Sequence, residues 1–312
     1  MKECLPLRGI VTVLNTPFTA TNEVDAAALR RHVRVALDAG VAGFLIPGMA
    51  SEVDKLTPAE RDLLVNTVLA EAKGRACVIG GASAASPAER VRLAQRLVAA
   101  GCDGVLVSVP YENDEQYSRT VCEVADTSPP FLMLQDWDAR GYGVPVPTLV
   151  QLFETVEAVR AVKVEVVPAG RKYSELIAAT GGRLHVSGGW AVMQMIEALD
   201  RGVHTFMPTA LHGIYVAIHR LHLAGRREAA RELFARLLPI LAFSNQHLDV
   251  SIHFFKRLLH AQGIYPTPNV RPPILPFDDN HARIATELIA YARELEAEIA
   301  SPTSVSNLPQ PQ

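Results

Sequence analysis

The 312-residue sequence lacks several features that mark common classes of protein. It has only four cysteines, and because none of them form a C-x-x-C pair, neither a zinc site nor a redox pair is predicted. The formal net charge is −3 and there is no long basic run, which argues against nucleic acid as a partner. The first residues lack the apolar core of a signal peptide, and no apolar run is long enough to span a membrane. We therefore expect a cytoplasmic protein with free thiols, no metal and no membrane partner.

Nucleotide-binding motifs are missing as well. No G-x-G-x-x-G or G-x-x-x-x-G-K-[ST] motif follows a predicted strand, which makes an open, doubly wound sheet the less favoured of two α/β folds. What the sequence contains instead is a repeated unit of a helix, a glycine, a short loop and an apolar strand. Residues 39–45 resemble residues 100–106, and residues 201–207 are a weaker copy. This alternation is typical of a parallel sheet with crossover helices.

The number of predicted strands matches that of a closed barrel. The strands cover residues 9–14, 43–46, 77–80, 104–106, 131–135, 159–165, 184–187 and 205–207. We expect a (β/α)8 TIM barrel over residues 7–223, with helices that begin after Asp25, Thr57 and Ser86. Further helical segments predict a C-terminal helical appendage over residues 224–299. Residues 300–312 are polar and rich in Pro and Ser, which predicts a disordered tail.

Lys163 is the most informative single residue. The chain has six lysines, and this is the only one inside an apolar strand. Because strand side chains alternate, Ala161, Lys163 and Glu165 share one face, which is interior if helices cover both sides of the sheet. A buried lysine tends to lose its proton, and a neutral amine forms a Schiff base with a ketone. The alternative is a structural lysine that reaches water or pairs with Glu165.

Segments that follow the predicted strands carry candidate ligands for a substrate. A glycine-containing turn directs consecutive backbone amides at an anion, an arginine pairs with a carboxylate, and glycines permit close approach of the backbone to a ligand. Each segment is also compatible with a plain connection between a strand and a helix, and His212, after the last strand, is interpreted as structural. The predicted substrate-binding residues are Gly48, Met49, Ala50, Ser51, Asp136, Arg140, Gly188 and Gly189.

Several of these motifs together resemble those of the dihydrodipicolinate synthase / N-acetylneuraminate lyase family. The resemblance covers about residues 7–297 and rests on residues 48–52 followed by Leu56, Glu60 and Arg61, on residues 16–18, on residues 109–111 and on Lys163. It implies a (β/α)8 barrel with C-terminal helices, usually assembled as a homotetramer. It also implies that Lys163 forms a Schiff base with pyruvate or a related 2-oxo acid, so that no external cofactor is needed.

The sequence departs from the family pattern at the proton relay. Gln135 stands where the family has a tyrosine beside the lysine, and glutamine cannot exchange a proton near neutral pH as a phenol can. Met49 and Ala50 replace two hydroxyl residues of the loop motif, and Glu112 replaces a second tyrosine that reaches into a neighbouring subunit. Glu165, Asp136 or a bound water would then carry the proton.

Together these observations predict a Schiff-base-forming lyase or aldolase that acts on a 2-oxo acid. The predicted catalytic residues are Lys163, Gln135 and Glu165. One alternative is a hydro-lyase that uses the same iminium without cleaving a carbon–carbon bond. The other, from a different class, is a non-catalytic barrel that binds a 2-oxo acid.

Overall fold

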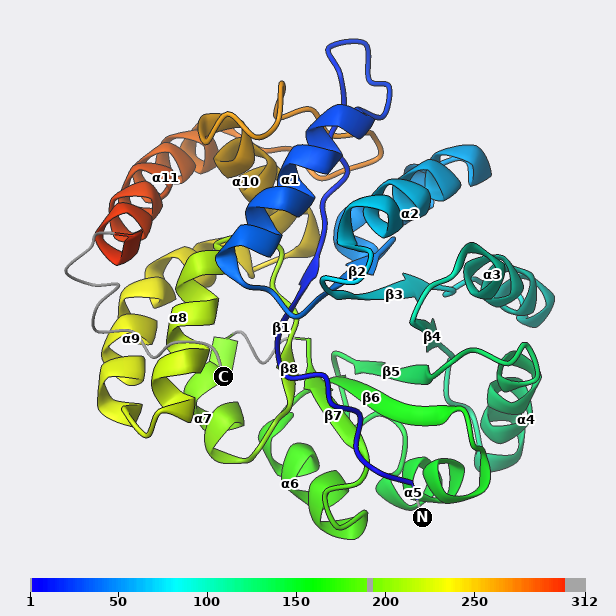
Figure 1. The fold of residues 1–312 in the computed structure, drawn as a ribbon. Helices are drawn as coiled ribbons and strands as arrows, with labels where there is room; N and C mark the ends of the chain where they lie inside the picture. The colour runs from blue at the N-terminus through cyan, green and yellow to red at the C-terminus, as the bar shows by residue number, and fades with distance from the viewer. Residues whose placement is uncertain (1, 190–192, 301–312) are drawn as a thin grey trace. The chain divides into compact units, whose positions relative to one another are not determined.

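In the computed structural model, which describes residues 2–189 and 193–300, eight strands form a closed barrel in sequence order (Figure 1). The strand pairs with a defined register, such as β5 with β6, are parallel. The strands are β1 Gly9–Val13, β2 Gly43–Ile46, β3 Cys77–Gly81, β4 Gly104–Ser108, β5 Leu132–Asp138, β6 Val159–Val166, β7 His185–Gly188 and β8 Thr205–Phe206. The predicted (β/α)8 barrel is therefore confirmed. Several predicted strand boundaries were wrong, most of all at β5, which continues to Asp138 rather than ending at Gln135.

Helices alternate with these strands, as the repeated sequence unit predicts (Figure 1). They are α1 Ala26–Ala39, α2 Pro58–Ala72, α3 Pro87–Ala100, α4 Asp114–Ala125, α5 Val146–Thr155, α6 Gly170–Ala179, α7 Met195–Asp200 and α8 His212–Leu223. A C-terminal appendage follows, formed by α9 Arg227–Ser244, α10 Leu248–Ala261 and α11 Asp279–Ala300. The last helix includes Ala300, the first residue of the predicted tail, and residues 301–312 lie outside the described residues.

Local sequence signals determine where several helices begin and end. The side chains of Asp25 and Ser86 accept hydrogen bonds from backbone amides of the first turns of α1 and α3, and Thr57 forms a capping box with Glu60 at α2. Gly40 ends α1 in the left-handed conformation, with φ of 91°, which a residue with a Cβ rarely adopts. The helix starts predicted from the sequence are confirmed.

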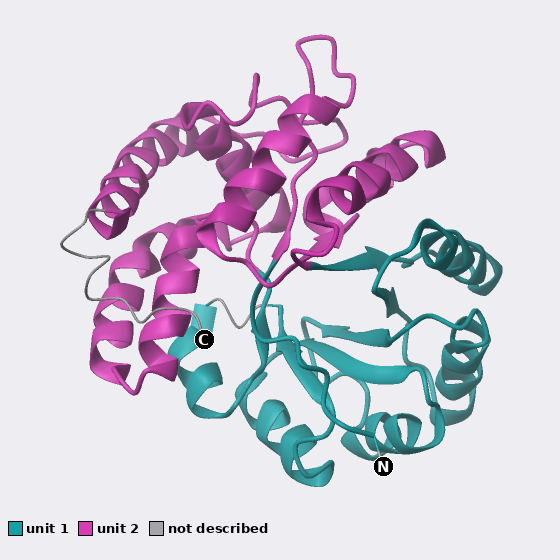
Figure 2. Ribbon diagram, in the orientation of Figure 1, with its two compact units in different colours: residues 1–11, 77–207 teal, residues 12–76, 208–312 magenta. Residues whose placement is uncertain are grey.

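The chain divides into two compact units (Figure 2). The first comprises residues 1–11 and 77–207, and the second comprises residues 12–76 and 208–312. In the second unit α8 packs against α9 and α11, and α1 packs against α2. The predicted boundary at residues 223–224 falls within this unit, between α8 and α9, so the division into 7–223 and 224–299 stays a prediction.

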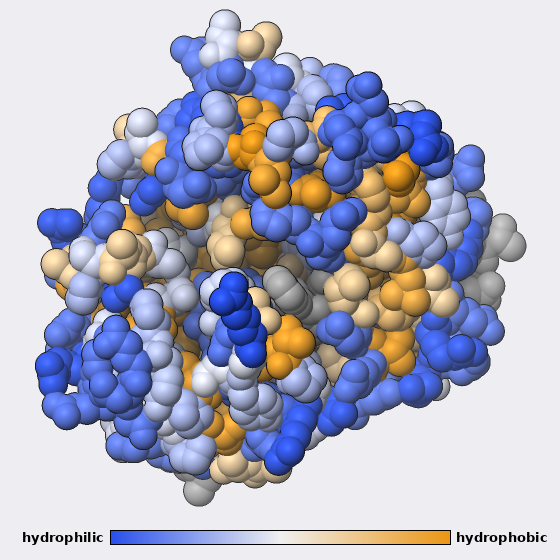
Figure 3. Space-filling model, turned by 180° about the vertical axis from the view of Figure 1, so that it is seen from behind, coloured by the Kyte–Doolittle hydropathy of each residue, from blue (hydrophilic) through white to orange (hydrophobic). Residues whose placement is uncertain are grey.

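Hydrophobic side chains line the strands on both faces, and a smaller number reach the surface. In β1, β2, β7 and β8 every residue is buried, as expected for parallel strands that helices cover. On the face shown in Figure 3, groups of hydrophobic residues lie among hydrophilic ones. Met49 and Trp137 are each about half exposed, and both belong to segments predicted to form the site. No helix among the described residues is long and apolar enough to cross a membrane.

Candidate active site

Strand β6 places Lys163 and Glu165 together in the first unit. The two residues are separated by one position, so their side chains leave the strand on the same face. The Lys163 Nζ lies 3.0 Å from the Glu165 Oε1, and the two side chains are only 8% and 7% exposed. The structure therefore brings together both interpretations of Lys163: it is interior, and it is paired with Glu165.

Strand β5 adds Gln135 to this pair. Gln135 lies opposite Lys163 in the register of β5 and β6, and it is almost completely buried. Its Nε2 donates to the Glu165 Oε2 at 2.5 Å, so the two oxygens of the carboxylate have different partners. Gln135 thus fixes the orientation of the carboxylate, and the three predicted catalytic residues form one hydrogen-bonded group.

The glycines after β7 leave space for this group. Gly188 pairs with Val164 of β6, and Ser187 lies opposite Lys163. A Cβ built on Gly189 would collide with the Glu165 carboxylate, so a residue with a side chain there would displace Glu165. Gly189 therefore leaves the Glu165 carboxylate its space, and its close approach to a ligand stays a prediction. The rest of this predicted segment, from Trp190, lies outside the described residues.

The structure does not bring Asp136 to this group. Asp136 follows Gln135 directly on β5, so the two side chains point to opposite faces of the strand. Its Oδ2 pairs with the Lys172 Nζ of α6 at 2.5 Å, and its Oδ1 accepts from the Val144 amide at 2.8 Å. Burial raises the pKa of Asp136, and the adjacent Lys172 opposes that rise. Asp136 joins β5 to α6 through this ion pair, and its role as a substrate ligand or proton carrier stays a prediction.

The segment after β5 folds around another carboxylate, that of Asp138. Its Oδ1 accepts from the backbone amides of Arg140 and Gly141, both at 2.9 Å, and its Oδ2 accepts from the Gly143 amide at 3.3 Å. These bonds hold the pKa of Asp138 below its usual range. Arg140 lies exposed in this loop, and its contact with a substrate carboxylate stays a prediction.

In the second unit, the predicted carboxylate-binding turn is a single 3₁₀ turn, Met49–Ser51. The Ser51 hydroxyl donates to the Leu14 carbonyl at 2.6 Å, and the Ser51 amide donates to the Gly48 carbonyl at 3.0 Å. Both Ser51 donors are used within the unit, and the role of Ser51 in binding substrate stays a prediction. The first amides of a helical turn have no partner in the turn itself. The backbone amides of Met49 and Ala50 therefore stay predicted donors to the substrate carboxylate. Gly48 permits close packing on Val13, whose Cγ1 would lie 2.7 Å from a Cβ at this position.

Two residues after β1 hold this turn in place. The Asn15 Nδ2 donates to the Ala50 carbonyl at 2.7 Å, and the Thr16 hydroxyl donates to the Ser51 carbonyl at 2.6 Å. Both Asn15 and Thr16 are fully buried. The motif at residues 16–18 and the motif at residues 48–52 are therefore parts of one structural element.

Sequence reasoning missed two buried lysines, Lys172 and Lys256, both of which are fully buried. Lys256 of α10 pairs with Glu52 and donates to the Asn269 carbonyl at 2.8 Å. Burial lowers the pKa of Lys256 to about 8, although Glu52 opposes this shift. A signal was present, because Lys172 precedes Leu176 by four residues and so lies on the buried face of its helix.

Metal ligation has no support among residues 2–189 and 193–300. In that part of the chain, no group of three or more histidine, cysteine, aspartate or glutamate side chains is arranged to hold a metal ion. The chemistry that the site supports is carried by the lysine, the carboxylate and the amide described above.

Comparison with solved structures supports the fold. Dihydrodipicolinate synthase from Rhodopseudomonas palustris superposes with a TM-score of 0.84, covering 95% of this chain and 100% of the other at 23% identity. Dihydrodipicolinate synthase from Thermotoga maritima superposes with a TM-score of 0.84 at 20% identity, covering 92% of this chain and 99% of the other. At these identities the likeness shows the barrel fold alone.

Sequence comparison identifies the family. An L-2-keto-3-deoxyarabonate dehydratase from Azospirillum brasilense is 28% identical over 306 residues, which covers 93% of this chain and 94% of that protein. A 4-hydroxy-tetrahydrodipicolinate synthase from Sorangium cellulosum is 31% identical over 249 residues, covering 76% and 80%. The model of the dihydrodipicolinate synthetase family matches residues 6–292. Because this match covers nearly the whole chain, the protein belongs to the dihydrodipicolinate synthetase family.

Proposed function

We propose that this chain is a lyase that forms a Schiff base between Lys163 and a 2-oxo acid. The observation that carries the proposal is the 3.0 Å contact between the Lys163 Nζ and the Glu165 Oε1 on an interior face. A lysine amine becomes a nucleophile when a nearby base takes its proton, and Glu165 is in position to do so. Membership of the family supports the same chemistry. The covalent lysine adduct serves as the electron sink, so we propose that no external cofactor is needed.

The reaction begins when the Lys163 amine attacks the C2 ketone. Glu165 returns the lysine proton to the C2 hydroxyl of the addition product, which leaves as water. The resulting iminium withdraws electrons from the neighbouring carbon C3. Glu165 then takes a proton from C3 and leaves an enamine. Gln135 holds the carboxylate through Oε2, which keeps Oε1 directed toward the reacting nitrogen.

Dehydration is the outcome that we favour for a substrate with a hydroxyl on C4. The enamine electrons expel the C4 hydroxyl, which recovers the proton from Glu165 and leaves as water. Hydrolysis of the resulting unsaturated iminium frees Lys163. The name of the relative from Azospirillum brasilense, a 2-keto-3-deoxy sugar acid dehydratase, supports this choice. Glutamine at position 135 supports it too, because the phenol implied by the family resemblance is absent there.

Aldol cleavage is the second candidate, because the same carboxylate can serve it. Glu165 would then take the proton of the C4 hydroxyl, the bond between C3 and C4 would break, and the enamine would be protonated at C3. The relative from Sorangium cellulosum, named a synthase, supports carbon–carbon chemistry at this site.

Reductive trapping tests the nucleophile. Borohydride added with pyruvate should attach one pyruvyl group per chain, and peptide mapping should find it on Lys163. The variant Lys163→Ala should lose this label, while Lys73→Ala, which removes an exposed lysine, should keep it. Equal labelling of wild type and Lys163→Ala would reject the proposal.

A panel of 2-oxo-3-deoxy acids separates the two reactions and the non-catalytic alternative. Dehydration should yield one product that has lost water, whereas cleavage should release pyruvate and an aldehyde. Trapping on Lys163 without turnover of any substrate would favour a barrel that only binds 2-oxo acids.

We also propose that the chain acts in the cytoplasm and forms a homotetramer, the assembly that the family resemblance implies. Glu112, at the position of the tyrosine that reaches into a neighbouring subunit, is exposed and so free to lie at a contact. Light scattering of the purified protein at micromolar concentration should give four times the chain mass of 33.9 kDa. A monomer under these conditions would contradict the proposed assembly but not the barrel.

A further inference from the structure

Trp137 is a large side chain of the first unit that has no role in the proposed reaction. It directly precedes Asp138, the last residue of β5, and it is 49% exposed. Among the residues that the structure describes, its indole Nε1–H has no hydrogen-bond partner. An indole can bury a large apolar area and can donate one hydrogen bond. Trp137 is therefore free to make both kinds of contact with a ligand.

The alternation of β5 places the Trp137 side chain on the inner face of the barrel. Trp137 comes two residues after Gln135, whose side chain meets the Glu165 carboxylate on that face. Asp136, between them, points the opposite way and pairs with Lys172 of α6. Trp137 therefore shares a face with the predicted catalytic residues, and not with the side chains that meet the surrounding helices.

Strand register places Trp137 next to Glu165. β5 and β6 lie side by side (Figure 1), with Gln135 opposite Lys163 and Trp137 opposite Glu165. Neighbouring strands are about 4.8 Å apart, so side chains in opposite positions on one face are neighbours. The inner face thus has one row that holds Gln135 and Lys163, and a second row, farther along both strands, that holds Trp137 and Glu165.

The second row is open at Trp137. The side chains of Gln135 and Glu165 are almost completely buried, whereas Trp137 is half exposed. A Cβ built on Gly189 would collide with the Glu165 Oε1, so this oxygen is directed toward the end of β7, on the side of β6 away from β5. The carboxylate therefore leaves the indole uncovered, and an aromatic surface borders the group that would take the proton from the substrate.

We propose that Trp137 is a specificity-determining residue that binds the part of a 2-oxo acid beyond C4. This inference rests on the proposed function, because it takes C2 to be bonded to Lys163 and C3 to lie at Glu165. The chain beyond C3 extends toward the exposed row, since the row that holds Lys163 is buried. There the face of the indole packs on C–H groups of the chain, and Nε1–H donates to one of its hydroxyls. The substrate class is therefore a 2-oxo-3-deoxy acid whose chain continues beyond C4 and carries hydroxyl groups.

The variant Trp137→Ala separates short from long 2-oxo acids. Pyruvate ends at C3 and does not reach the indole, so the pyruvate concentration that half-saturates borohydride trapping on Lys163 should stay close to that of wild type. With 2-oxo-3-deoxygluconate, KM should rise at least about tenfold because a large apolar contact is lost. The value of kcat should change little, because a contact made equally in the ground state and the transition state affects KM alone. Trp137→Phe keeps an aromatic ring and should recover part of the loss.

A control variant and a binding measurement complete the test. Leu223→Ala removes another exposed apolar side chain, at the end of α8 in the second unit, and should behave as wild type does. Calorimetry with 3-deoxygluconate does not depend on turnover, because this acid has a hydroxyl in place of the 2-oxo group and forms no Schiff base. It should bind Trp137→Ala at least about tenfold more weakly than wild type.

The outcomes distinguish this inference from the proposed reaction. Failure of pyruvate to label Lys163 in wild type would reject the Schiff base, and calorimetry would then decide the role of Trp137 by itself. An unchanged KM for 2-oxo-3-deoxygluconate in Trp137→Ala would overturn the inference. Equal losses with pyruvate and the longer acid would also overturn it, because they would show a general disturbance of the site. So would 3-deoxygluconate that binds wild type and Trp137→Ala equally, or binds neither.

Discussion

At the residue scale, both oxygens of the buried Glu165 carboxylate have a partner. An ion pair away from water is costly unless its remaining lone pairs are hydrogen-bonded. The Glu165 Oε1 meets the Lys163 ammonium and the Oε2 meets the Gln135 amide, while Gly189 leaves the carboxylate its space. Gln135 is therefore a positioning residue for Glu165, a role that a residue with a shorter side chain would not fill.

The variant Glu165→Gln tests whether this carboxylate moves protons. Glutamine keeps the size of the side chain but cannot accept a proton, so turnover should fall about 10²–10⁴-fold. Steady-state kinetics with the best substrate of the panel measures this loss. Borohydride trapping should label Lys163 more slowly than in wild type, because Glu165 also takes the proton of the amine. The control Glu154→Gln, which alters a surface pair with Arg183, should leave turnover unchanged. Full activity of Glu165→Gln would show that another group carries the proton.

At the element scale, a buried ion pair joins strand β5 to helix α6. Lys172 pairs with Asp136 and also donates to the carbonyls of Tyr142 and Val144, which belong to the connection between β5 and α5. One side chain thereby holds a strand, a helix and a loop. Because Gln135 precedes Asp136, this arrangement also limits movement of the strand that carries Gln135.

Lys172→Met should lower the free energy of unfolding by about 3–5 kcal/mol, because it leaves Asp136 charged and buried without its partner. Urea unfolding measures the loss, and adding Asp136→Asn should recover part of it by removing the isolated charge. Arg171→Met is the matched control on the same helix: Arg171 is exposed and pairs with Glu175, so little change is expected. If Lys172→Met and Arg171→Met lowered the free energy of unfolding equally, this account would be contradicted.

At the scale of the whole molecule, the pKa values of several buried histidines are lowered, so these side chains are neutral at pH 7. Burial lowers the pKa of His185 to about 3 and that of His204 and His212 to about 4. In the unfolded chain these groups take up protons near pH 6.5, so between about pH 6.5 and 4 the unfolded state binds more protons. Their contribution to stability is therefore present above pH 6.5 and is lost as the pH falls.

Urea unfolding between pH 7 and 4.5 should show this loss directly. Replacing His185 by glutamine removes one titrating group, so the fall of the unfolding free energy with pH should become shallower, by at most about 1.4 kcal/mol per pH unit. His247→Gln is the control, because this side chain is 53% exposed. An unchanged slope in His185→Gln would show that His185 is not neutral in the folded protein.

The sequence by itself determined the barrel and predicted its nucleophile. Apolar strands, glycines at helix ends and capping residues are local signals, because each can be recognised from a few neighbouring residues in the sequence. Lys163 was found in the same way, because a lysine in an apolar strand is a local anomaly and strand alternation places Glu165 beside it. The family resemblance then identified Gln135 as the departure beside the lysine.

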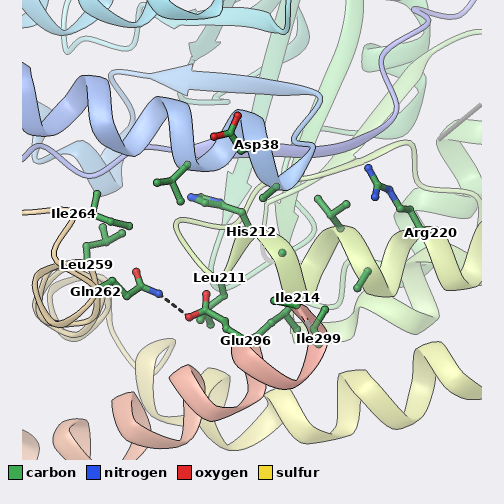
Figure 4. Close-up of a pocket in the computed structure, with 16 residues that line it drawn as sticks. Asp38, Leu211, His212, Ile214, Arg220, Leu259, Gln262, Ile264, Glu296 and Ile299 are labelled. Carbon is green, nitrogen blue, oxygen red and sulfur yellow. Dashed lines mark hydrogen bonds between the residues drawn. The ribbon is translucent and has the colours of Figure 1, made fainter. Parts of the chain in front are cut away.

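Only the tertiary structure decided which polar groups meet across the fold. Asp136 and Lys172 belong to different elements, as do Glu52 and Lys256, and no local periodicity specifies such pairs. A cavity lined by Arg220 likewise depends on how α1, α8, α10 and α11 pack (Figure 4). The physical reason is that a charged side chain in the interior must find a partner, and which partner it finds depends on contacts distant in the sequence.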